Sequence, residues 1–174
     1  AGDVEFATQL ATASEQQYYE YSRSAYGVDP DEPLLLVDDA FTNADFIRLA
    51  LHILLQQTGS EIVLINNSLF RFDGVEFPRY DGDLRYRKIS VRLLEQILWA
   101  DNELATMRLT GQQLSALQRI STANASTGKE NFLHHLQVTT DGNEELYVHN
   151  APLQQKYPPE LYSIVTSNFL AGGA

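Results

Sequence analysis

The chain has 174 residues, of which 44% are apolar and 10% aromatic, and this composition excludes an intrinsically disordered protein. Its net charge of −11 argues against nucleic acid as a partner, because phosphate backbones need a basic surface. The chain has no cysteine, which excludes disulfides, thiolate chemistry and cysteine-ligated zinc. No run of 18 apolar residues is present, so the sequence predicts no membrane span.

The first 33 residues are predicted to form a helix and an acidic loop. Residues 3 to about 25 lack Gly and Pro and are rich in Ala, Gln and Glu, so they predict a helix that ends near Gly27. The loop at 28–33 comes next. We interpret residues 1–33 as linker-like and residues 34–174 as one domain.

Helices and strands mix along the rest of the chain. Short apolar runs predict buried strands at 34–37 and 61–66, and the second suits a strand buried on both faces. Capping boxes at Thr42 with Asp45 and at Thr110 with Gln113 open two predicted helices. Between them we expect a loop or an irregular hairpin over 73–88, a helix that opens at Ser90 and a strand over 103–109.

The C-terminal third is richer in strands. After a loop predicted at 121–129, strands are expected at 133–140 and 145–149, joined by a hairpin turn at 141–143. A last strand at 161–166 leads into a turn at 167–168. The pattern predicts an α+β fold, with a mixed sheet, packed helices and a C-terminal hairpin.

The bases of the chain cluster. Six of the 12 lie within 22 residues, and they are Arg71, Arg79, Arg85, Arg87, Lys88 and Arg92. A local basic cluster in an acidic chain suits a small anion. Exposure to solvent, or pairing with nearby acids, is the alternative that the sequence leaves open.

Two strand ends carry candidate ligand contacts. Asn66 ends one strand, and Arg71 follows five residues later. An Asn amide can both donate and accept hydrogen bonds, and an Arg guanidinium can bind a phosphate or carboxylate through two hydrogen bonds. Phe169 follows the last strand beside Gly172 and Gly173, where an aromatic ring and bare backbone suit a flat ligand. The alternative for the first strand end is an ordinary turn followed by a surface Arg. The alternative for the second is that Phe169 fills the core.

These motifs resemble the C-terminal domain of the 5′-nucleotidase / UDP-sugar hydrolase family. The closing stretch SIVTSNFLAGG resembles the last motif of that domain, and Asn66 and Arg71 match the ends of its Asn-Gly-Gly-Gly-Ile-Arg run. Asp101 and Asn102 match a further run. The resemblance covers about residues 34–174 and implies a domain truncated at its end, because an Asp that closes the family motif is missing.

The chain departs from the family pattern at two further places. The three glycines between Asn66 and Arg71 are replaced, and the residues that stand there are Asn67, Ser68 and Leu69. Ala100 stands where the family has one of two Phe rings that sandwich the nucleobase, with Trp99 beside it. Both departures put nucleotide binding in doubt.

The resemblance implies a substrate-recognition role. Asn66 would contact the base, Arg71 the phosphate, and Phe169 would stack on the base. Further candidates are Trp99, Asp101, Asn102, Gly172 and Gly173. The ligand implied is a nucleotide or a nucleoside-like small molecule. We interpret the alternative as a degenerate, non-catalytic domain of the same fold that packs or binds protein.

No catalytic residue, metal ligand or cofactor is expected in these residues. The resemblance places a divalent metal pair in a separate N-terminal metallophosphoesterase domain, and we expect no turnover from this chain alone. Hydrolysis needs such a pair or an activated nucleophile, and the sequence shows no motif for either. The sequence does not determine a compartment; the resemblance suggests a periplasmic or extracellular one.

Overall fold

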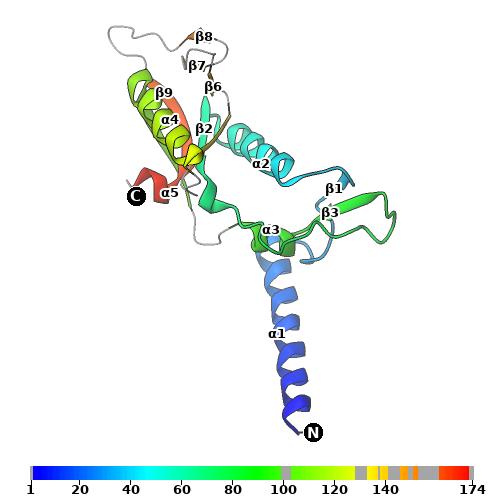
Figure 1. The fold of residues 1–174 in the computed structure, drawn as a ribbon. Coiled ribbons are helices and arrows are strands. Elements are labelled where there is room, and N and C mark those ends of the chain that lie inside the picture. Colours follow the sequence, from blue (N-terminus) through cyan, green and yellow to red (C-terminus); the bar gives the residue numbers. More distant parts are fainter. Residues whose placement is uncertain are drawn as a thin grey trace. The chain divides into compact units, whose positions relative to one another are not determined.

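The structure is a computed structural model that describes residues 2–98, 103–127, 133–136, 138–140, 146–148, 151–152 and 161–172. The chain divides into two compact units, which are Ala1–Phe41 with Phe72–Leu98, and Thr42–Arg71 with Trp99–Ala174. The chain contains both helices and strands, and the sheet of the second unit is mixed, which confirms the predicted α+β class (Figure 1). The described residues include no helix with the length and apolar character that a bilayer crossing requires.

The first unit contains two helices and a two-stranded ribbon. Its elements are α1 (Gly2–Tyr26), β1 (Leu35–Asp38), β3 (Tyr86–Ile89) and α3 (Val91–Ile97). Strands β1 and β3 run antiparallel. Helix α1 ends where predicted, because Gly27 takes a left-handed backbone angle of φ 77° that side chains disfavour.

Arg92 is the centre of the first unit. Its guanidinium forms a bidentate pair with Asp31, with N···O distances of 2.7 and 2.9 Å, and also donates to Glu15. The same group lies 4.7 Å from the ring centre of Tyr18, so a cation–π contact adds to the ion pairs. The Tyr18 hydroxyl donates to Glu95. These contacts fasten α1 to the 28–33 loop and to α3.

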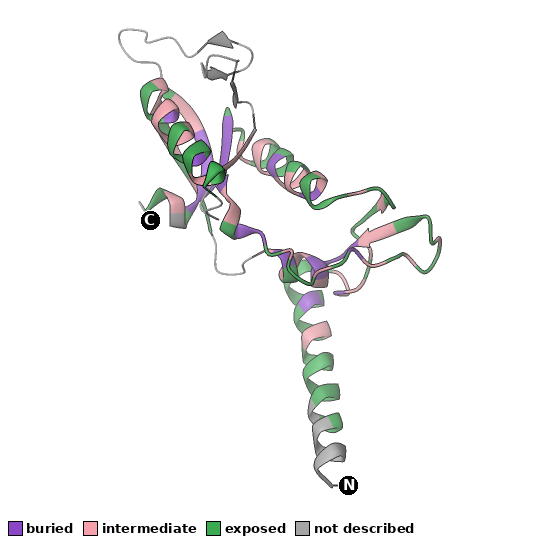
Figure 2. Ribbon diagram, in the orientation of Figure 1, coloured by how far each residue is buried: buried purple, intermediate pink, exposed green. Residues whose placement is uncertain are grey.

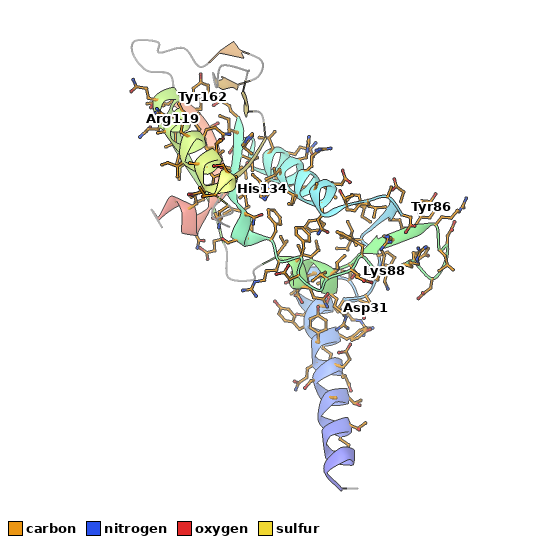
Figure 3. The ribbon with its side chains drawn as sticks, viewed as in Figure 1. Asp31, Tyr86, Lys88, Arg119, His134 and Tyr162 are labelled. Atoms are coloured by element: carbon orange, nitrogen blue, oxygen red, sulfur yellow. The ribbon has the colours of Figure 1, made fainter. Side chains whose placement is uncertain are left out.

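Four more of the six clustered bases interact within this unit. Arg79 and Arg87 share Asp39, Arg85 pairs with Asp83, and Lys88 Nζ donates to the backbone carbonyl of Asp31 at 3.2 Å. Figure 3 labels Asp31 and Lys88 on neighbouring segments of the ribbon. The structure therefore favours pairing with acids over a small-anion site for this cluster.

One prediction for the first unit is wrong and another is confirmed. Strand β1 forms, but Leu34, Leu35 and Leu36 are 40% to 47% exposed, because the strand pairs only with β3 and enters no central sheet. The irregular hairpin expected as one alternative over 73–88 forms, since Tyr86 begins strand β3 and Arg79 makes an antiparallel bridge with Arg87. A short apolar run does not by itself show which sheet a strand joins.

The second unit is built on a four-stranded mixed sheet in the order β4-β9-β2-β5. Its helices and strands are α2 (Asn43–Thr58), β2 (Ile62–Asn66), η1 (Asn67–Leu69), β4 (Leu104–Thr110), α4 (Gly111–Ser126), β5 (Leu133–Leu136), β6 (Val138–Thr140), β7 (Leu146–Val148), β8 (Ala151–Pro152), β9 (Leu161–Ser167) and α5 (Asn168–Ala171). Strands β6, β7 and β8 form a separate small antiparallel sheet. Both predicted capping boxes are present, at Thr42 with Asp45 and at Thr110 with Gln113.

The core of this unit surrounds β2 and β9, which are parallel neighbours. Four consecutive residues of β2 are buried, which confirms a strand covered on both faces (Figure 2). On one face Ile62, Leu64 and Ile164 pack with Leu114 of α4. Helix α2 contacts β2, β5 and β9. The two strand ends that carry the candidate site are therefore fixed by the best buried part of the sheet.

Several predicted details of this unit differ. Helix α4 runs on to Ser126, so the predicted loop at 121–129 is wrong over its first six residues. The predicted strand at 133–140 is two strands in different sheets. Ile53 of α2 and Ile120 of α4 are 48% and 60% exposed. The hairpin turn predicted at 141–143 lies outside the described residues.

The Arg92 pair makes a pH-dependent contribution to stability. Arg92 lowers the pKa of Asp31 from 3.8 to about 2. The contribution is complete above pH 3.8 and is lost as the pH falls through that value towards 2. Because the Asp31 side chain is 38% exposed, we expect solvent to reduce the contribution to about 1 kcal/mol.

We predict that Asp31→Asn lowers the free energy of unfolding by about 1 kcal/mol at pH 6 and by much less near pH 2, because protonation of Asp31 then removes most of the contribution of the pair in wild type. Urea unfolding of both proteins at several pH values measures the difference. Glu32→Gln, at a neighbouring exposed carboxylate, serves as the control. A destabilisation by Asp31→Asn that is the same at pH 6 and pH 2 would contradict the prediction.

Candidate functional site

The ends of β2 and β9 bring two of the predicted motifs together. In the parallel register Ile62 lies beside Ile164 and Val63 beside Val165, so the strands end at the same edge of the sheet. At that edge the buried Ser167 hydroxyl donates to Asn66 Oδ1 at 3.1 Å. A direct hydrogen bond thus joins Asn66 to the closing motif, 101 residues later in the chain.

Ser167 also caps the next element of the chain. Its hydroxyl accepts a hydrogen bond from the Leu170 N–H at 3.3 Å at the start of the short helix α5. The sequence predicted only a turn at 167–168, and this is wrong, because Asn168 begins a helix. A Ser directly before Asn-Phe-Leu-Ala is an N-cap signal that the sequence reasoning missed.

Asn66 retains hydrogen-bonding capacity among the described residues. Its Nδ2 donates to Ser68 and its Oδ1 accepts from Ser167. An Asn amide has two donor hydrogens and an oxygen with two lone pairs. Among the described residues, these two contacts leave one donor and one acceptor position of the amide unused.

The side chains that replace the three glycines are held by the protein. Asn67 Oδ1 is 2.8 Å from His134 Nε2 of β5, Ser68 accepts from Asn66, and Leu69 is only 8% exposed. Each of these residues thus has a partner within the second unit or packs into its core. This arrangement reduces the concern that they obstruct the loop.

The other predicted residues are placed to different degrees. Arg71 follows the loop with an exposed side chain. The backbone of Phe169 lies in α5, and its side chain lies outside what the structure describes. Gly172 is exposed and ends α5, donating to the Asn168 carbonyl at 2.9 Å. Four candidates fall outside the described residues, and they are Trp99, Asp101, Asn102 and Gly173.

The second unit also has a hollow of about 290 Å³ between α2 and β5. Its lining includes Arg48, Leu51 and His134, and it includes neither Asn66 nor Arg71. The hollow is therefore separate from the predicted contacts, although His134 borders it and also touches Asn67.

A metal site does not fit the described residues. Within the ranges that the structure covers, no three His, Cys, Asp or Glu side chains lie close enough together to hold an ion. His134 and His135 are neighbours on β5, and burial lowers the pKa of His134, with a further lowering from His135. No reaction step through a metal is therefore assigned to these residues.

Comparison with known proteins now identifies the domain. The model of the family described as 5′-nucleotidase, C-terminal domain, matches residues 31–174. The chain belongs to this family. The 5′-nucleotidase C-terminal domain match begins close to residue 34, and the boundary between a linker-like segment and the domain stays a prediction.

Two solved structures, with TM-scores of 0.55 and 0.51, support the same fold. A 5′-nucleotidase structure from Staphylococcus aureus, solved with α-ketoglutarate, has a TM-score of 0.55 at 13% identity, over 83% of this chain and 32% of that one. The NAD nucleotidase of Haemophilus influenzae has a TM-score of 0.51 at 13% identity, over 72% and 22% of the two chains. A 5′-nucleotidase precursor from Thermus thermophilus has a TM-score of 0.49 at 18% identity, over 74% of this chain and 25% of that one.

This chain therefore spans about a fifth to a third of the length of these similar proteins. At 13% identity, the similarity to the Staphylococcus aureus and Haemophilus influenzae proteins shows the fold alone. A comparison with curated proteins gives no match.

Replacing Ser167 tests the link between the two motifs. We predict that Ser167→Ala lowers the free energy of unfolding by about 1–2 kcal/mol, because it removes a helix cap and a buried hydrogen bond. Urea denaturation measures the change. Ser14→Ala, at an exposed position of α1, is the control and is expected to change stability by less than about 0.5 kcal/mol. Equal effects of the two changes would contradict the assigned role of Ser167.

Proposed function

We propose that residues 34–174 are the substrate-recognition domain of a metal-dependent 5′-nucleotidase-like phosphoesterase. The observation that carries the proposal is the hydrogen bond between Ser167 and Asn66, which joins the two family motifs at one sheet edge. Strand ends that lead into polar loops are where α/β sheets place ligands. The ligand class is a nucleotide or nucleoside, and the names of the similar solved proteins favour the same class.

In this proposal the domain binds and orients the substrate. Asn66 pairs with the base edge through its remaining donor and acceptor. The Arg71 guanidinium binds the phosphate, which is a charge-assisted interaction stronger than a neutral hydrogen bond. Phe169 stacks on the base. Orientation of a substrate contributes to catalysis by lowering the entropic cost of reaching the reactive geometry.

The metal pair of such an enzyme would be held by an N-terminal metallophosphoesterase domain, the proposed partner of this one. When bound, the pair would supply an activated water and stabilise charge on the phosphoryl group. The residues of the proposed site bind the substrate and do not supply metal ligands. We expect no phosphate release from a nucleotide by these 174 residues alone.

A second candidate function is a degenerate domain that packs or binds protein. The replaced loop glycines and Ala100, in place of a stacking Phe, favour it. The two functions differ in whether the chain binds a nucleotide at all.

Calorimetric titration with AMP and adenosine separates them. We predict that wild type binds both, that Arg71→Gln weakens AMP about tenfold with little effect on adenosine, and that Asn66→Ala weakens both ligands. The reason is that only AMP carries the phosphate, whereas both ligands carry the base. Circular dichroism checks that each variant is folded.

Arg119→Gln is the matched control, because Arg119 is an exposed arginine on α4 of the same unit (Figure 3). It should leave both affinities unchanged. An absence of binding heat at millimolar ligand would reject the proposed function and favour the degenerate domain. An equal loss of AMP and adenosine binding in Arg71→Gln would reject a phosphate contact.

A further inference from the structure

The loop between Asn66 and Arg71 is tied to a distant strand. His134 Nε2 of β5 lies 2.8 Å from Asn67 Oδ1, across a separation of 67 residues in the chain. The pairing of β2 with β5 places His134 opposite Ile65, one residue before the end of the strand. The imidazole therefore lies where the loop begins, in the same unit as the two proposed contacts.

The imidazole is itself fixed by aromatic packing. Its ring meets Phe70 edge-on, with ring centres 5.7 Å apart, and Phe70 meets Phe46 of α2 in the same way at 6.4 Å. Phe46 and Phe70 are 3% and 7% exposed. Such edge-to-face pairs are favourable in packed interiors. His134 therefore contacts both ends of the short helix η1, through Asn67 and through Phe70.

The charge state of His134 suits a stable hydrogen bond to Asn67. Burial lowers the pKa of His134, with a further lowering from His135, so the neutral imidazole dominates at pH 7. A neutral ring with hydrogen on Nε2 donates to the Asn67 oxygen. The hydrogen bond does not require a charged group in the aromatic environment.

A bare glycine loop would lose conformational entropy each time a ligand orders it. In this chain the loop is instead held at Asn67 by His134, and Leu69 is buried. These contacts form without a ligand, and the two ends of the loop are Asn66 and Arg71. An ordered loop presents those two side chains at a fixed spacing.

We propose that His134 is a positioning residue, which through Asn67 holds the 66–71 loop in the conformation that presents Asn66 and Arg71 to the nucleotide. This inference rests on the proposed function. It assigns the positioning of the loop to β5, which lies outside both of the motifs that match the family. It also gives a function to Asn67, which stands where the family has a glycine.

A double-mutant cycle tests the pair. The four proteins are wild type, His134→Leu, Asn67→Ala and the double variant, with two measurements, AMP affinity by calorimetry and amide hydrogen exchange over 66–71 by NMR. We predict that each single change speeds exchange of the loop about fivefold and weakens AMP binding about fivefold. The double variant should lose no more than either single one, because the two residues act as one unit.

His134→Gln should restore most of the affinity, since its amide can donate to Asn67. This variant also answers the concern that His134→Leu merely unfolds the unit. His135→Gln is the matched control, because adjacent residues of a strand face opposite sides of the sheet, and it should leave loop exchange and AMP affinity unchanged.

The outcomes separate this inference from the proposed function. If wild type does not bind AMP, the proposed function fails and the positioning role fails with it. If wild type binds AMP but the variants leave loop exchange and affinity unchanged, only the positioning role is overturned. Additive losses, of about 25-fold in the double variant, would show that the two residues act separately. This result would also overturn the proposal that His134 acts through Asn67.

Discussion

The parallel pairing of β2 with β9 is the constraint on which the rest of the candidate site depends. Ile62, Val63, Ile164 and Val165 are fully buried, and their register fixes where both strands end. A slip of one residue would turn each side chain to the opposite face of the sheet. The buried core therefore fixes the ends of the strands, and the Ser167 to Asn66 hydrogen bond follows from that register.

The second consequence concerns the loop that lost its glycines. In isolation, Asn67, Ser68 and Leu69 suggest an obstructed ligand site. In the structure their side chains turn to His134, to Asn66 and to the core. A loop of bare backbone and a loop of satisfied side chains can both leave room for a ligand. They differ in the conformational entropy that binding must overcome.

Local signals in the sequence predicted local structure well. The capping boxes at Thr42 and Thr110 formed as expected, because each depends only on residues three apart. The burial of β2 also followed from its own composition. The family resemblance rested on short motifs and is confirmed by the match over 31–174, whereas the roles of Asn66 and Arg71 stay predictions.

Features that depend on distant partners could not be predicted in this way. Exposure of β1 depends on which strand it joins, and Leu35 pairs with Ile89 far along the chain. The contact between Asn67 and His134 depends on the β2–β5 register, and no pattern around either residue reports it. Helix α4 extends past its predicted end through Ser, Thr and Asn residues, whose weak helix propensity is overridden in the structure.

The central claim is that Asn66, its loop and the closing motif form one ligand site. Backbone amide chemical shifts during an AMP titration, followed by NMR on the whole chain, test this most directly. The account predicts that residues 66–71 and 167–170 shift together, with a common dissociation constant. Shifts confined to one of the two segments, or found only elsewhere in the chain, would contradict it.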